Sequence, residues 1–341
     1  MRRALAFIVA AGLIAGSLAL RDRIDDRSER KSTVVRLVCA TELAAACDEL
    51  AKSRDIQVRT VVEPAGATTE RLSKPGEIDL DGWLVMPPWP DVVDNTRERA
   101  GLPRLFGAVG EPVARSPLVL AVRDQREATL RTSSSCGGTI GWRCVGDAAA
   151  ATSWETIGGR PEWGRVKPEH PDPLLEATGL LLVGQASADY FGRTDLSSTT
   201  DLRDDAFLAW LGFLERAVSI NNATLETMLT EPAFVDVLGT IEAEAVTLIA
   251  VAATQDKPVV LYPQPMATAD AVFAPVAGRR VSGTLRDLVT DGGRQALAAA
   301  GWRVAGQPLA EGLEPRTLPP NSGLPSAGLL EALRGPISEI R

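Results

Sequence analysis

The sequence predicts an α/β fold, and its first thirty folded residues carry that prediction. Residues 34–40 (VVRLVCA) are a β-branched run typical of a buried strand. Residues 41–53 then have the spacing of an amphipathic helix, which Thr41 can cap and which carries Glu42 in its first turn. Residues 56–64 alternate as a second strand does. A β-α-β opening indicates a parallel sheet, and 341 residues with 45% hydrophobic composition suffice for one large core or two ordinary ones.

Strand and helix patterns alternate along the rest of the chain, without internal repeats. In order, we expect a strand, a Pro-Pro-Trp-Pro turn and a helix at 78–98, a buried strand at 116–123, a short helix at 153–159, helices at 178–191 and 204–219, a turn at Gly239-Thr240 followed by a helical segment, a buried strand at 258–265, two tandem helices at 282–305 and a last helix at 327–334.

Residues 1–21 predict an export signal or an N-terminal membrane anchor. Two arginines precede the apolar run Ala4–Leu20, and charged residues follow it. No cysteine lies near its end and no A-x-A site precedes Arg21, so we favour an uncleaved transmembrane anchor over a signal that is removed on secretion. Residues 22–33 form a charged linker, and the remaining chain is expected outside the cytoplasm.

The four cysteines agree with export. Cys39 and Cys47 form one pair eight positions apart, and Cys136 and Cys144 form another. An oxidising compartment favours disulfides, and of the three possible connectivities the local one closes the shortest loops. A zinc site needs shorter spacings within each pair, and buried free thiols are the remaining alternative.

Composition excludes several classes of function. A net charge of −8 repels phosphate backbones, so we expect no nucleic-acid partner. His170, the only histidine, lies in a proline-rich loop and is expected to be exposed. No Walker loop, G-x-S-x-G or G-x-G-x-x-G motif is present, so neither an enzyme nor a cofactor is expected.

The order of these elements over residues 34–334 resembles the type II periplasmic solute-binding proteins, the two-lobed receptors of ABC importers. Seven segments carry the resemblance: VVRLVCATELAAACDELAK, DGWLVMPPWPDVV, SPLVLAVR, HPDPLLEATGLL, GTIEAEAV, PVVLYPQP and LRDLVTDGGRQALAAAGWR. None is a catalytic motif, and their order is more specific than any one of them.

The resemblance implies a two-lobe α/β fold with a ligand held between the lobes. Lobe 1 is expected to be discontinuous, at 34–122 plus 256–334, and lobe 2 to span 123–255. Ligands of open α/β sheets bind where strands end and helix N-termini point, and hinged closure is the motion expected of such lobes.

The helix starts at Thr41-Glu42 and Thr178-Gly179 are therefore the first candidate ligand contacts. A helix N-terminus offers free N–H groups and a partial positive charge, which suits an oxyanion or a carboxylate. The alternative is that Thr178 only caps its helix. Glu42 beside one helix start would itself repel an anion.

Five further candidate ligand contacts follow from the resemblance, and each has a structural alternative. Ser116 precedes a crossing strand and is equally suited to capping a turn. Thr240 and Glu242 match the second-lobe contact of the family, although Glu242 also suits the first turn of a helix. Tyr262 and Trp89 can wall the cleft or pack internally.

The turn that usually carries a serine in the family reads Met86-Pro87-Pro88 here. It has no side-chain donor, and prolines lack the backbone N–H. This departure argues against a small oxyanion held by many hydroxyls.

The sequence thus predicts an extracytoplasmic solute-binding protein that captures a small polar ligand, with an ABC transporter permease as its partner. The alternative is a membrane-anchored surface protein that uses the same fold for signalling or scaffolding without a small-molecule ligand. An anchored enzyme with paired carboxylates is a third reading.

Overall fold

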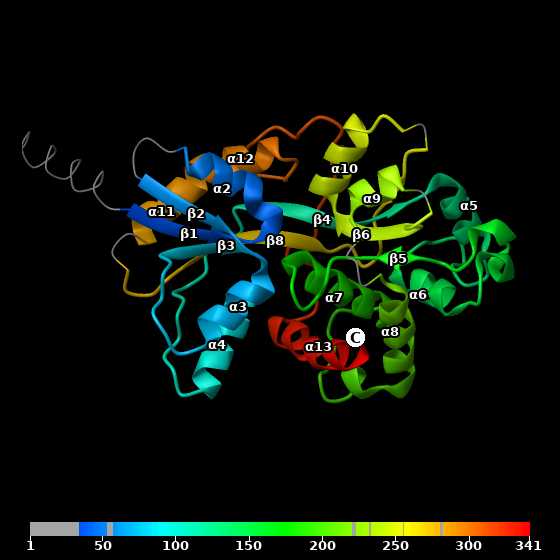
Figure 1. The fold of residues 1–341 in the computed structure, drawn as a ribbon, viewed down its shortest axis with the longest axis horizontal. Helices are drawn as coiled ribbons and strands as arrows, with labels where there is room; N and C mark the ends of the chain where they lie inside the picture. Colours follow the sequence, from blue (N-terminus) through cyan, green and yellow to red (C-terminus); the bar gives the residue numbers. More distant parts are fainter. Residues whose placement is uncertain (1–33, 53–56, 220–222, 232, 255, 280–281) are drawn as a thin grey trace, which may run out of the picture.

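The computed structural model describes residues 34–52, 57–219, 223–231, 233–254, 256–279 and 282–341, which form an α/β molecule (Figure 1). Eight strands within these residues make one sheet in the order β2-β1-β3-β8-β4-β6-β5, with β7 paired to β4 off this path. The strands are β1 (Val34–Cys39), β2 (Gln57–Val62), β3 (Gly82–Val85), β4 (Ala114–Val122), β5 (Pro168–Glu169), β6 (Val237–Ile241), β7 (Val259–Leu261) and β8 (Thr268–Pro275).

The first lobe is built on β2, β1 and β3, which run parallel, and on β8, which is antiparallel to β3. The parallel pairing confirms the β-α-β opening expected from the sequence. The helices of this half are α2 (Ala44–Leu50), α3 (Ala65–Ser73), α4 (Trp89–Arg99), α11 (Ser282–Leu288) and α12 (Arg294–Ala299), with a π-helical turn, η5 (Val289–Gly293), between the last two. Figure 1 shows α2, α11 and α12 on one face of the sheet and α3 and α4 on the other.

The second lobe is built on β4, β6, β7 and β5. Its helices are α5 (Asp124–Thr132), α6 (Trp142–Ala150), α7 (Ala177–Phe191), α8 (Asp205–Ala217), α9 (Leu225–Thr230) and α10 (Glu242–Val251). α7 is buried over most of its length, from Ala177 to Ala188, because its residues are apolar or small on every side.

Two strands join the lobes. β4 pairs with β8 from Ala114 to Pro117 and then continues with β6 from Leu118 to Val122. The exact lobe boundaries, 34–122 plus 256–334 and 123–255, stay a prediction. The last helix, α13 (Ala327–Ile340), crosses the predicted limit at residue 334 and packs on α7 and α8.

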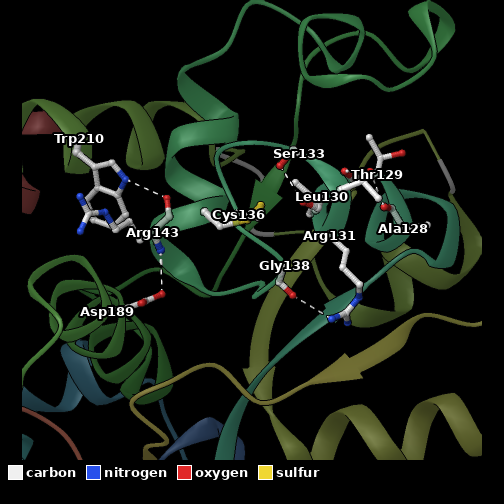
Figure 2. The surroundings of a disulfide bond; sticks show 12 residues. Ala128, Thr129, Leu130, Arg131, Ser133, Cys136, Gly138, Arg143, Asp189 and Trp210 are labelled. Atoms are coloured by element: carbon white, nitrogen blue, oxygen red, sulfur yellow. Dashed lines mark hydrogen bonds between the residues drawn. A yellow bond between two sulfur atoms is a disulfide. The ribbon is translucent and has the colours of Figure 1, made fainter.

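Both local disulfides are present, as the cysteine spacing predicts. Cys39 bonds to Cys47 at the end of β1, and Cys136 bonds to Cys144 at the start of α6. Figure 2 shows the second disulfide and its surroundings, where Arg143 lies between Trp210 and Asp189. The Arg143 N–H donates to the Asp189 carboxylate at 2.9 Å, so the start of α6 is fixed to α7.

Several local predictions were wrong. Gly239-Thr240 lies inside strand β6, because pairing with β4 extends this short, buried run instead of turning it. The expected strand at 258–265 is only β7, which is half-buried, and the longer strand β8 was not predicted. Thr41 makes no cap hydrogen bond and lies in a short 3₁₀ turn, η1 (Thr41–Leu43).

His170 is also not where the sequence places it, since it is 1% exposed. Its Nε2 lies 3.1 Å from a carboxylate oxygen of Glu215, which is itself buried. Burial alone would lower the pKa of His170, but the charge and hydrogen bond of Glu215 outweigh it and raise the pKa.

Within the described residues, no helix combines the length and apolar character needed to cross a bilayer. The predicted anchor, Ala4–Leu20, lies outside those residues.

Candidate functional site

A cavity of about 380 Å³ lies between the lobes, where η1, α7 and α10 begin. Thr41, Glu42 and the segment after α12 bound it on the first-lobe side, and the starts of α7 and α10 bound it on the second-lobe side. Its lining residues are Thr41, Glu42, Pro171, Glu176, Thr178, Ala223, Thr224, Leu225, Leu238, Gly239, Thr240, Ile241, Ala243, Glu244, Thr247, Ala300 and Trp302.

The start of α7 is occupied by a carboxylate of the protein itself. One oxygen of Glu42 accepts hydrogen bonds from the Thr178 backbone N–H at 2.7 Å and from the Thr178 hydroxyl at 2.8 Å. Thr178 therefore does not cap its own helix. The helix N-terminus that suits an anion already holds one, and it comes from the other lobe.

Two more carboxylates, those of Glu176 and Glu244, line the cavity together with Glu42. Burial raises the pKa of Glu176, and the charge of Glu42 raises it further, against a hydrogen bond from the Thr41 side chain. Burial also raises the pKa of Glu244, which accepts a hydrogen bond from the Thr240 hydroxyl at 2.5 Å. Negative charges placed close together in a poorly hydrated space oppose one another's ionisation.

Inside the cavity, no described basic side chain is available to pair with these carboxylates. Among its described lining residues there is no Lys, Arg or His. One oxygen of Glu42 and one of Glu176 are buried without a hydrogen-bond partner in the described structure. Unpaired buried carboxylate oxygens are costly, so a cation or a donor placed here would be stabilised strongly. In the described residues no three His, Cys, Asp or Glu side chains are arranged to hold a metal ion.

Four of the nine residues expected to bind ligand line this cavity: Thr41, Glu42, Thr178 and Thr240. The other five lie outside it. Ser116 is buried, and its hydroxyl accepts a hydrogen bond from the Ala243 N–H at 3.0 Å, so it satisfies the start of α10.

Glu242 and Tyr262 belong to a buried ion-pair network beside the cavity. The Glu242 carboxylate accepts two hydrogen bonds from Arg303, at 2.6 and 2.8 Å, and one from the Tyr262 hydroxyl at 2.5 Å. Burial and then Glu242 raise the pKa of Tyr262 to about 12. The Arg316 guanidinium lies 3.6 Å from the centre of the Tyr262 ring. Both side chains are thus hydrogen-bonded within the protein, and their role as ligand contacts stays a prediction.

Gly179 and Trp89 both make close packing contacts within the protein. A Cβ on Gly179 would lie 2.3 Å from the Pro171 carbonyl oxygen, so the close approach that glycine permits is made by the chain's own loop. Trp89 is completely buried at the start of α4, and Arg334 lies 5.1 Å from its ring centre.

The sequence argument missed Glu176, Glu244 and Trp302. Glu176 stands two residues before Thr178, and Glu244 stands two residues after Glu242, so both are adjacent to predicted contacts in the sequence. Trp302 follows the glycine that ends α12, and only the folded chain brings it to the second lobe.

Glu169 is a buried carboxylate that does not line the cavity, and we expect it to make the stability of the fold depend on pH. The side chain is 2% exposed and has one oxygen without a partner in the described structure, while the other accepts the Ser219 N–H at 2.8 Å. Burial raises the pKa of Glu169 from 4.5 to about 7, against the Ser219 hydrogen bond and the charges of His170 and Arg341.

Between pH 4.5 and about 7 the folded chain therefore holds a proton that the unfolded chain has lost, so stability falls as the pH rises through that window. Glu169→Gln removes this titration. We expect the variant to be about 1–3 kcal/mol more stable than the wild type at about pH 8 and equal to it at about pH 4. Urea unfolding across this range measures the effect, with the exposed Glu77→Gln as control; an unchanged pH slope contradicts it.

Comparison with known proteins identifies the fold. No protein-family profile matches the sequence, and no curated protein matches it. Solved structures do match. A periplasmic thiamin binding protein aligns over 90% of this chain and 95% of its own, with 13% identity and a TM-score of 0.60. The chain has the fold of the type II periplasmic solute-binding proteins.

Two further structures with this fold show the same coverage of the chain. Iron-bound HitA from Pseudomonas aeruginosa has 14% identity and a TM-score of 0.60, with 99% of its own chain covered. AfuA from Actinobacillus pleuropneumoniae, with fructose-6-phosphate bound, has 12% identity and a TM-score of 0.60, with 98% covered. At these identities the likeness establishes the periplasmic-binding-protein fold, and ligand identity has to be argued from the cavity.

Proposed function

We propose that this chain is an extracytoplasmic solute-binding protein that captures a small ligand bearing a positive charge and delivers it to an ABC-type importer. The observation that carries the ligand class is the lining of the cavity between the lobes. It holds three carboxylates and no described basic side chain.

The cavity also offers an apolar side. Leu225, Leu238 and Trp302 line it together with the acidic residues. Trp302 is 2% exposed and lies next to the part of the cavity bounded by α12. An organic cation, with an ammonium or other cationic group and an apolar body, matches both kinds of surface. Ligands of this class bind by charge pairing at one end and apolar burial at the other.

Native mass spectrometry of the purified chain followed by a thermal-shift screen tests this function. The screen contains polyamines, quaternary ammonium compounds, basic amino acids and thiamin, with sulfate, phosphate and neutral sugars as comparison. We expect a rise in Tm that grows with the concentration of a cationic compound, because a ligand that binds only the folded state stabilises it by mass action.

Charge-neutral variants locate the site. Glu176→Gln and Glu244→Gln keep an acceptor oxygen and remove a charge, and each is expected to weaken binding about tenfold, or about 1.4 kcal/mol. The matched control is Glu162→Gln, whose side chain is 66% exposed and lies outside the cavity. Stabilisation by an anion, or a shift that both cavity variants leave unchanged, contradicts the proposal.

One observation favours a second candidate, a membrane-anchored surface protein without a small-molecule ligand. Glu42 already makes the hydrogen bonds to Thr178 that a ligand would make. If no compound in the screen raises Tm and the native mass is that of the bare chain, this candidate replaces the first.

A further inference from the structure

The last helix touches both lobes. Figure 1 shows α13 between α4 of the first lobe and α8 of the second, beneath α7. The chain reaches this place along the two joining strands. Arg115 of β4 donates to the Pro319 carbonyl at 2.9 Å, and the Thr268 N–H of β8 donates to the Ser322 carbonyl at 2.8 Å. Ser326 then begins the helix by accepting the Leu329 N–H at 3.3 Å.

The apolar face of α13 belongs to the second lobe. Leu329, Leu330, Leu333 and Ile337 are all at most 3% exposed, and the helix packs on α7 and α8. Gly184 of α7 is the contact point, since a Cβ there would lie 2.3 Å from a Leu330 methyl group. Burying four such side chains strongly favours this packing, because their apolar surface is removed from water.

Ion pairs of Arg341 fix the C-terminal end of α13 to the second lobe. The Arg341 guanidinium donates to Glu215 of α8 at 2.8 Å and lies 3.3 Å from Asp172. Glu215 also pairs with the buried His170. His170 and Asp172 lie in the loop that continues into Glu176 and Thr178, so this anchor and the cavity wall share one short segment.

The opposite face of α13 holds the first lobe. Glu331 accepts a hydrogen bond from the Asn95 amide of α4 at 2.8 Å and one from Arg99 of the same helix at 2.5 Å. Arg334 lies over the ring of Trp89, at the start of α4. The side chain of Glu331 is only 19% exposed, so these contacts are partly shielded from water.

Besides the Arg303–Glu242–Tyr262 network, two direct contacts near the cavity join the lobes. The Gly66 N–H of α3 donates to the Leu175 carbonyl at 2.7 Å, and Glu42 binds Thr178. The contacts of Glu331 and Arg334 with α4 join the same two lobes at a different place. Any motion that separates α4 from α7 must break the Glu331 hydrogen bonds or pull α13 from the second lobe.

We propose that α13 is an interlobe strap, which holds the two lobes closed over the cavity and must release α4 before they can part. The inference concerns closure alone and does not depend on which ligand, if any, the cavity takes.

Distances between spin labels on the full chain test the strap. All four cysteines are in disulfides, so cysteines introduced at Lys74 in the first lobe and Asp195 in the second can be labelled selectively. Their side chains are 65% and 88% exposed. With the native strap we expect one narrow distance distribution. In Glu331→Lys, which puts a positive charge against Arg99, we expect a second, longer population that is absent from the parent.

The matched control is Glu339→Lys, which makes the same charge change at an exposed position of α13 and should reproduce the parent distribution. Should Glu331→Lys not fold, Glu331→Ala serves in its place. A folded Glu331 variant whose distances superimpose on those of the parent overturns the proposal. So does a parent that already shows both populations, because the strap would then not hold the lobes.

Discussion

Replacing Arg303 with methionine is expected to lower the free energy of unfolding by about 3–5 kcal/mol, the largest effect of any single change considered. Arg303 is the partner of Glu242, a carboxylate with 0% of its side chain exposed. Without the guanidinium, the buried Glu242 carboxylate keeps the hydrogen bond from Tyr262 but loses its ion-pair partner. Urea unfolding at neutral pH gives the difference directly.

The double variant Glu242→Gln/Arg303→Met is the control for this interpretation. It removes both charges and keeps side chains of similar size. We expect it to recover most of the lost stability, because replacing both members of a buried pair costs much less than removing one. A double variant as unstable as Arg303→Met would mean that packing around Arg303, and not its charge, sets the cost.

Gly179→Ala is expected to be the second most damaging change, at about 1–3 kcal/mol of stability. The new methyl group would meet the Pro171 carbonyl oxygen at 2.3 Å and the Asp172 backbone at 2.7 Å. These backbone atoms must shift, and with them the loop that carries Pro171 and Glu176 into the cavity. We therefore expect the variant to lose ligand-induced stabilisation as well as intrinsic stability.

Gly328→Ala is the matched control, because it makes the same substitution in the first turn of α13, where no atom outside its own helix and chain neighbours lies within 4 Å of the new Cβ. Alanine is the better helix former, so this variant should be more stable than the wild type by up to about 1 kcal/mol. Equal effects of the two substitutions on stability would show that the contact with the 171–172 loop does not limit α7.

Local pattern was enough to predict the elements whose signal lies within one short segment. The β-branched run before Thr41, the apolar helix after Glu176 and the two cysteine pairs are of this kind. Periodicity and spacing indicate each of them, even though β1 takes its pairing partners from β2 and β3 further along the chain.

The features that could not be predicted from the sequence depend on residues far apart in the chain. β6 looks like a turn at Gly239-Thr240 until β4 pairs with it, more than a hundred residues earlier in the chain. His170 becomes a buried group because Glu215 meets it from α8. The start of α7 was predicted to bind a ligand, and no local pattern indicates that the Glu42 carboxylate from the other lobe occupies it.

The direction of β1 determines how far the start of the described chain lies from the cavity. Its six residues run from Val34 to Cys39, and the chain then enters the cavity wall at Thr41. A strand of that length spans about 20 Å at 3.3 Å per residue. Val34, the first described residue, therefore stands about 20 Å from the cavity wall, at the other end of β1. The described chain thus begins away from the interlobe cavity and first reaches it at Thr41.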